Sequence, residues 1–192
     1  MIPFKIFCRN RQFVIQPLCL RRGKRSIYQP TFLGSFDTME ERLISGILQR
    51  VNLTALLISS ISRNGDVGKV FQRLAQNRIN VEFVNKISLQ NGHASVLLCV
   101  DSKDLYSAVA VLEEIKNAAH ELDIFPPARV AILSLFPHRE HPIISGIITQ
   151  TLSAAHIPLL AMASSLSSIS CVIHEERLSE ALGLLSKTFG LS

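Results

Sequence analysis

The chain has 192 residues, of which 47% are hydrophobic and 18% are charged. This length is enough for two small hydrophobic cores. No segment approaches the roughly 18 consecutive apolar residues that a membrane-spanning helix needs, which excludes a helical membrane protein. The net charge of +5 is local, because residues 1–38 carry seven basic residues and one acidic residue. The remaining residues are nearly neutral, so the charge does not indicate a nucleic-acid-binding domain.

Residues 1–38 show neither helical nor strand periodicity and contain the basic cluster Arg21–Arg25. This pattern predicts a mostly disordered segment. Arginine-rich, acid-poor composition is also typical of a transit peptide, and a basic tail can bind phosphate or a membrane surface. A third interpretation, which we favour, is that translation starts at Met39, directly before the first patterned segment. The mass of the native protein distinguishes these alternatives.

An internal repeat organises the rest of the chain. Residues 94–101 align with residues 167–174 at a shift of 73, and the apolar residues that follow them keep this spacing. The aligned residues are Leu105, Ala108 and Leu112 with Leu178, Ala181 and Leu185. Residues 79–81 align with residues 157–159 at a shift of 78, which predicts a longer early loop in the second copy. The preserved order predicts two copies of one domain.

The first copy has the pattern of a βαββαβ domain. Strands are expected at 55–61, 81–87, 94–100 and 122–125, and helices at 67–74 and 105–115. Asn91-Gly92 suits a tight turn between the second and third strands, and Ser102 is placed to cap the second helix. Such an order packs two helices on one face of an antiparallel sheet.

The second copy repeats this order but ends on a helix. Its elements are expected at 129–133, 143–155, 157–163, 168–173 and 175–189. The unassigned apolar segment Leu43–Leu48 is the candidate for the missing closing strand. The predicted organisation is a basic segment at 1–38, a strand completing the second domain at 39–52, a first domain at 53–127 and a second domain at 128–192.

These patterns resemble the paired ACT domains at the carboxyl end of bacterial aspartate kinases, over roughly residues 43–191. The resemblance rests on the order and spacing of Ile44–Ile47, Ile79–Val84, His141-Pro142, Ser164-Ser165, Ile169–Ile173 and Lys187–Leu191. It implies an α+β fold of two ferredoxin-like βαββαβ ACT domains in tandem, each an antiparallel four-stranded sheet with helices on one face. In that family, a segment before the first domain also completes the sheet of the second.

The family's kinase domain has no counterpart in these residues, since the basic segment 1–38 is too short to contain it. Gly65–Lys69 places a lysine after glycines but lacks the spacing of a phosphate-binding P-loop. We therefore expect no catalytic residues, no cofactor and no kinase activity.

The resemblance also implies a ligand site, because ACT domains bind effectors at the turn before their first helix, against the second strand of a facing domain. The corresponding residues are Ser62, Arg63, Asn64, Gly65, Asp66, Val67 and Gly68 in the turn and Asn80, Val81 and Glu82 in the strand. N–H groups at a helix start can hold an amino acid's carboxylate, while Asn80 and Glu82 suit its ammonium group.

This site departs from the family pattern. The family commonly has Asp-x-Pro-Gly in the turn and Asn-x-Asp in the strand, and this chain matches neither fully. A purely structural interpretation stays open, in which Asp66 caps the helix, Gly65 makes the turn and Asn80 satisfies a loop. In the second copy, Pro158 and Leu160 replace the polar strand residues. The family's turn glycine is replaced by isoleucine there as well, so the second copy is predicted to be structural.

No metal site is predicted, because His138 and His141 share a turn without a third ligand. The four cysteines have no C-x-x-C spacing, which indicates free thiols and a cytoplasmic protein.

Three functions compete. The first is an amino-acid sensor, for lysine or threonine first, that regulates a catalytic enzyme partner. The second is an assembly module with a degenerate pocket. The third is RNA binding, which shares this topology but is disfavoured because the strand at 94–100 has no aromatic residue for base stacking. An unpaired strand at 79–87 predicts a homodimer. We expect no nucleic-acid partner and no membrane partner.

Overall fold

The computed structural model describes residues 4–9, 12–17, 43–61, 66–88, 93–119, 122–136 and 143–191. The chain divides into two compact units, Met1–Met39 and Glu40–Ser192. In the first unit, β1 (Phe4–Arg9) pairs antiparallel with β2 (Gln12–Pro17). In this pair, Ile6 lies opposite Ile15 and Phe7 lies opposite Val14. β-branched and aromatic residues have a high propensity for strands.

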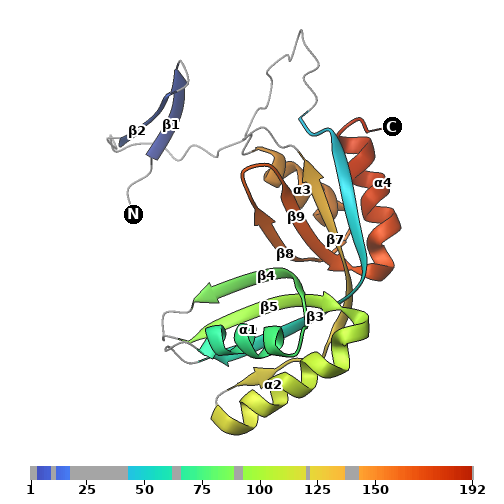
Figure 1. Ribbon diagram of the computed structural model, residues 1–192. Coiled ribbons are helices and arrows are strands. Elements are labelled where there is room, and N and C mark those ends of the chain that lie inside the picture. Colours follow the sequence, from blue (N-terminus) through green and yellow to red (C-terminus); the bar gives the residue numbers. More distant parts are fainter. Residues whose placement is uncertain are drawn as a thin grey trace. The chain divides into compact units, whose positions relative to one another are not determined.

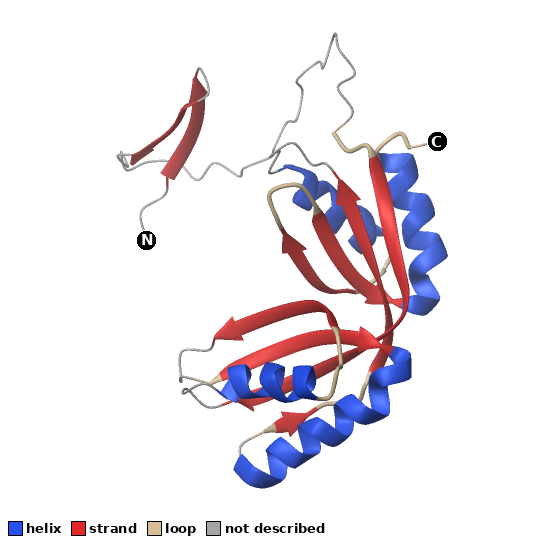
Figure 2. Cartoon of the chain, in the orientation of Figure 1, coloured by secondary structure: helices blue, strands red, loops and turns tan. Residues whose placement is uncertain are grey.

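The second unit is built on a seven-stranded sheet in the order β4-β5-β3-β7-β9-β8, with β6 paired to β3 (Figures 1 and 2). The elements are β3 (Gly46–Ile61), α1 (Asp66–Gln76), β4 (Val81–Ser88), β5 (Ala94–Asp101), η1 (Ser102–Asp104), α2 (Leu105–Ala119), β6 (Asp123–Ile124), β7 (Ala128–Phe136), α3 (Ile143–Ala154), β8 (Leu159–Ser164), β9 (Ile169–His174), η2 (Glu175–Arg177) and α4 (Leu178–Thr188). Every strand pair is antiparallel.

Strand β3 belongs to both halves of this unit, and Figure 1 shows it running through both. Gly46–Arg50 and Leu53–Ala55 pair with β7, and Leu53–Ile61 pairs with β5 on the other side. The register against β7 shifts between Arg50 and Leu53, and Asn52 lies in the left-handed region with φ of 59°. A bulge of this kind bends a strand and increases its twist. The segments expected at 43–48 and 55–61 are thus joined into one strand.

The predicted fold class is confirmed. The first half has the strand order β6-β3-β5-β4 and the second has β3-β7-β9-β8, each with two helices. Leu56, Leu98 and other buried side chains pack under α1 and α2 in a first core. A second core around Leu133 and Leu185 lies under α3 and α4. Neighbouring strand residues point to opposite faces, and Cys99 accordingly belongs to a third cluster that contains side chains of both halves.

The repeat extends to the ends of the first helix in each half. Arg78 and His156 both adopt left-handed conformations, with φ of 57° and 53°. The N–H of Ile79 donates to the carbonyl of Leu74 at 3.0 Å, and the N–H of Ile157 donates to the carbonyl of Leu152 at 2.9 Å. This is the Schellman arrangement, which satisfies the last carbonyls of a helix. The same cap therefore occurs at the predicted shift of 78 residues.

None of the described helices is long and apolar enough to cross a membrane.

Candidate functional site

The predicted turn lies partly outside the described residues, which exclude Ser62, Arg63, Asn64 and Gly65. Asp66, Val67 and Gly68 form the first turn of α1. Val67 packs against the first core, and a Cβ at Gly68 would meet no atom within 4 Å. Among the described residues, none therefore fills the space beside Gly68 at the start of α1.

The predicted strand residues lie at the other end of the same sheet. In β4, Val81 is level with Val100 of β5 and, beyond it, with Thr54 of β3. Ser88 and Ile61 both pair with Ala94, at the end where α1 follows. The two ends are separated by the length of β4, roughly 20 Å at about 3.3 Å per residue. One chain by itself does not bring Glu82 to the first turn of α1.

Asn80 and Glu82 do lie together, and a third residue joins them. Glu82 Oε1 accepts a hydrogen bond from Asn80 Nδ2 at 2.9 Å and an ion pair from Arg50 Nη2 at 3.0 Å. The Glu82 side chain is 20% exposed and that of Arg50 is 60% exposed. The hydrogen bond from Arg50 lowers the pKa of Glu82, and Asn80 acts in the same direction, against the opposing effect of burial. Glu82 is thus an ionised carboxylate that faces donors.

Arg50 was not among the predicted site residues. It lies in β3 opposite Ile132 of the second half, whereas Glu82 lies in the first half. The sequence predicts that residues 39–52 complete the second domain. No local motif links positions 32 residues apart, so only the pairing of β3 with both halves reveals this contact.

Asp101 adds negative charge at the same end of the sheet. Its carboxylate accepts the backbone N–H of Lys103 at 3.0 Å and forms an ion pair with Lys103 Nζ at 3.4 Å. The hydrogen bond from that N–H lowers the pKa of Asp101. Beside it, Thr54 Oγ1 and Ser102 Oγ are 2.9 Å apart. This end of the first half therefore has two carboxylates, Glu82 and Asp101, each paired with one cationic side chain.

The equivalent strand start in the second half has no such groups. Pro158 directly precedes β8, and Leu160 packs against the third cluster. A cavity of about 460 Å³ nearby is lined by Ala128, Arg129, His174, Glu175 and Glu176. There Glu175 accepts hydrogen bonds from Arg129 Nε at 2.8 Å and from the N–H of Asn52 at 3.3 Å. These contacts hold the bulge of β3 against the start of η2.

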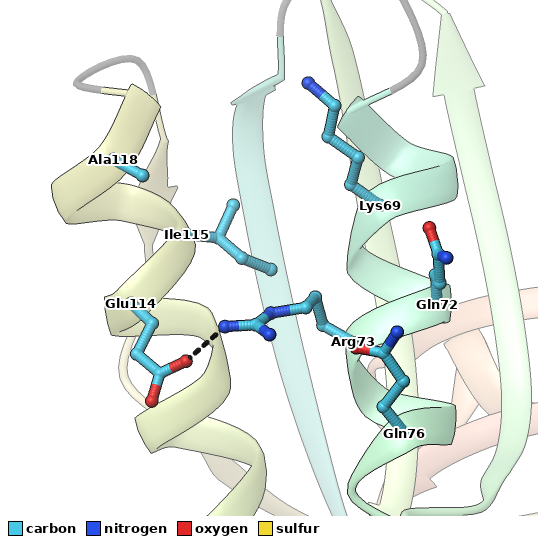
Figure 3. Close-up of a pocket in the computed structure, with 7 residues that line it drawn as sticks. All are labelled: Lys69, Gln72, Arg73, Gln76, Glu114, Ile115 and Ala118. Atoms are coloured by element: carbon cyan, nitrogen blue, oxygen red, sulfur yellow. Dashed lines mark hydrogen bonds and ion pairs between the residues drawn. The ribbon is translucent and has the colours of Figure 1, made fainter.

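A groove of about 410 Å³ lies between α1 and α2 (Figure 3). Its lining residues are Lys69, Gln72, Arg73, Gln76, Glu114, Ile115 and Ala118, and none of them is a predicted site residue. Arg73 crosses it to form an ion pair with Glu114 at 2.7 Å. The ion pair joins the two helices of the first half.

The described residues contain no cluster of His, Cys, Asp and Glu that could hold a metal ion. His138 and His141 lie outside the described residues. Cys99 and Cys171 are free and buried, and burial raises the pKa of each thiol to about 12. Both side chains belong to apolar clusters, where they behave as small hydrophobic residues.

No protein-family model matches the chain. The aspartokinase of Bacillus sp. (strain MGA3) is 24% identical over 166 residues, which are 84% of this chain and 40% of that protein. A crystal structure of aspartokinase alpha and beta subunits has a TM-score of 0.70 and 20% identity, over 77% of this chain and 99% of the matched chain. The regulatory subunit of aspartate kinase from Thermus flavus has a TM-score of 0.67 and 20% identity, over 76% of this chain and 98% of that subunit.

The fold is that of an aspartate kinase regulatory subunit. The resemblance to tandem ACT domains is thereby confirmed, and it concerns the regulatory part of aspartate kinase and not its catalytic part. The chain spans 40% of the length of the curated aspartokinase that it matches. At these identities, what the chain shares with the aspartate kinase regulatory subunits is their fold.

Proposed function

We propose that this chain is an ACT-type regulatory protein that binds an amino acid, of the lysine or threonine class first, and modulates an aspartokinase-like partner enzyme. The observation that carries the proposal is the ionised Glu82, held with Asn80 at the start of β4. A carboxylate with an adjacent amide is suited to an ammonium group, since charge-assisted hydrogen bonds are the stronger ones. The fold of regulatory subunits supports the same role.

The complete site requires two copies of the chain. β4 lies at an edge of the sheet, where Val84 and Ile87 are exposed. Unpaired strand edges tend to pair with another chain, and two-fold symmetry is the most common arrangement of homo-oligomers. Antiparallel pairing of two β4 strands sets the start of one strand beside the end of the other. Glu82 of one copy then lies near the start of α1 in the second copy.

In this arrangement the ligand bridges two chains. Its ammonium group binds Glu82 and Asn80 of one copy, and its carboxylate binds N–H groups at the start of the other copy's α1. The helix dipole favours the negative charge there. The proposal therefore includes a homodimer, and strictly monomeric protein in light scattering at tens of micromolar would contradict it.

The proposed partner is a catalytic enzyme, because the matched Thermus flavus protein is described as the regulatory subunit of aspartate kinase. Pure protein should show no aspartate-dependent ATP turnover of its own. The proposed location is the cytoplasm, which the free thiols of Cys99 and Cys171 support.

Thermal melting with each of the twenty amino acids tests the ligand. A ligand at 100 times its Kd stabilises the folded state by roughly 2.7 kcal/mol, which raises the melting temperature of a chain of this size by about 5–10 °C. We expect Asn80→Ala to abolish the shift and to leave the unliganded melting temperature nearly unchanged, because Asn80 is exposed. Pro158→Ala, at the equivalent position of the second half, is the matched control and should keep the shift.

The alternative function is an assembly module without a ligand, which the exposed edge of β4 also supports. A flat response to all twenty amino acids at 10 mM, in a protein that is dimeric, would favour this alternative. A shift that survives Asn80→Ala would place the ligand elsewhere.

A further inference from the structure

We propose that Arg50 occupies the ammonium position of the candidate site, so that a ligand must displace it from Glu82 and thereby loosens the junction between the two halves. This inference rests on the proposed function, because it concerns the same carboxylate. It adds a residue of β3 to the site and a route from the ligand to the second half.

The competition follows from the contacts of Glu82. Arg50 Nη2 and Asn80 Nδ2 both donate to the same oxygen, Oε1, at 3.0 and 2.9 Å. An ammonium group and a guanidinium group make the same kind of charge-assisted hydrogen bond to a carboxylate. A ligand that binds Glu82 through its ammonium group therefore replaces the contact made by Arg50.

The exposed fractions of the two side chains indicate that Arg50, and not Glu82, moves when a ligand binds. The Arg50 side chain is 60% exposed, so its guanidinium can turn into solvent without leaving a buried charge unpaired. The Glu82 side chain is only 20% exposed and keeps its hydrogen bond to Asn80. Displacement thus costs one exposed ion pair, which is a weak interaction.

The position of Arg50 in β3 links this exchange to the junction. Arg50 pairs with Ile132 of β7, and the register shift follows immediately, with Asn52 in the left-handed region. The ion pair to Glu82 therefore joins β4 of the first half to the β3 segment of the second half, next to the bulge. On the other side of the bulge, Glu175 holds the N–H of Asn52 and the side chain of Arg129. A ligand releases the ion pair between Arg50 and Glu82 and leaves the contacts of Glu175 intact.

The ligand class follows from this geometry. The displacing group must carry positive charge, because Glu82 and the nearby Asp101 are both anionic and both favour the positive charge of Arg50. Compounds with a free ammonium group qualify, and amino acids whose only amino group is acetylated do not. Ligand selection at this position therefore depends on charge.

Titration calorimetry on the full chain tests the inference, with L-lysine and L-threonine as probes and Nα-acetyl-L-threonine, which has no ammonium group, as a negative control. Arg50→Gln should bind the active probe about twofold to fivefold more tightly than the unsubstituted protein, in keeping with the small strength of exposed ion pairs. Arg129→Gln is the matched control, since it removes the other ion pair beside the bulge and does not contact Glu82. The affinity of Arg129→Gln for the probe should equal that of the unsubstituted protein. Circular dichroism establishes that both variants are folded.

Amide hydrogen exchange provides the second measurement. Ligand binding should accelerate exchange in the β3 residues around the bulge, and Arg50→Gln should show the faster rate without ligand. Unchanged affinity in Arg50→Gln would overturn the inference while the proposed function stands, and weaker binding would mean that Arg50 contacts the ligand itself. If no probe binds either protein, the proposed ligand function fails, and the inference fails with it.

Discussion

The two halves of the second unit have the same strand order and the same helix cap but differ at the start of their second strands. The first half has Asn80 and Glu82 there, with Arg50 added from β3. The second half has Pro158 and a leucine that packs into the third cluster. Equivalent apolar positions and caps are retained in both. The two halves therefore share the apolar positions and the caps on which the fold depends, and they differ in the polar groups at this strand start.

Strand β3 is shared by the two halves and links their stability. Because one strand completes both sheets, neither half has four strands without it. The third cluster further contains side chains from both halves. We therefore expect the two halves to unfold together, although their sites differ.

Leucine-to-alanine substitutions in the two cores give the strongest test of whether the halves unfold together. Leu56 and Leu133 are fully buried at equivalent positions, opposite Leu98 and Cys171 of the adjacent strands. Leu56→Ala and Leu133→Ala should each lower the free energy of unfolding by about 2–5 kcal/mol, because each leaves a cavity. Urea denaturation followed by circular dichroism should show a single transition in both variants. Two transitions, with only one shifted in each variant, would mean that the halves are independent.

Thiol labelling tests the junction between the halves. Cys99 lies in the third cluster and Cys171 in the second core, and burial raises the pKa of both from 9.0 to about 12. Only the thiolate reacts, so alkylation of each should be roughly a thousandfold slower than that of an ordinary thiol at the same pH. Peptide mass spectrometry after timed alkylation measures both rates. Fast labelling of Cys99 alone would show that the third cluster opens while the second core stays closed.

Much of this fold is predictable from sequence, because periodicity and an internal repeat are local signals. The sequence aligns residues 79–81 with residues 157–159 at a shift of 78, and the structure has equivalent helix caps at Arg78 and His156, directly before these segments. The continuity of β3 was not predictable, since Gln49, Arg50 and Asn52 interrupt the apolar pattern at the bulge. The strand residues of the candidate site are predicted from a family resemblance. Their partner Arg50 was not identified, because an ion pair between distant strands leaves no spacing in the sequence.

The helix caps offer a smaller test of how alike the halves are. Arg78 and His156 have positive φ, which costs an L-residue roughly 1–2 kcal/mol relative to the right-handed conformation. Glycine has no such cost but loses more entropy on folding. Arg78→Gly and His156→Gly should therefore each raise the free energy of unfolding by about 0.5–1 kcal/mol in urea denaturation.

Gly190 allows the reverse substitution, because a glycine already occupies the left-handed position after α4. It has φ of 64° after α4, and the N–H of Leu191 donates to the carbonyl of Ser186 at 2.8 Å. A Cβ there would meet no atom within 4 Å, so only the backbone conformation matters. Gly190→Ala should lower the free energy of unfolding by about 1 kcal/mol. An increase in stability would contradict the conformational argument for all three caps.

The smallest expected effect is the acid dependence of Glu82, which the second half lacks because Leu160 stands at that position. The pKa of Glu82 is lowered from 4.5, first by the hydrogen bond from Arg50 and also by that from Asn80, while burial and the charge of Asp101 oppose them. A carboxyl whose pKa is lower in the folded state adds stability that is fully present above its unfolded pKa. That stability is lost as the pH falls through the folded pKa.

The free energy of unfolding of the unsubstituted protein should therefore exceed that of Glu82→Gln by under about 1 kcal/mol near pH 7. The difference should shrink as the pH falls below 4.5, the ordinary value for glutamate. Urea denaturation at a series of pH values measures it, and Arg50→Gln should reduce the same difference because it removes the main cause of the lowered pKa. A difference that is constant with pH would mean that Glu82 stabilises the sheet by packing rather than by charge, and the electrostatic contrast between the two halves would be wrong.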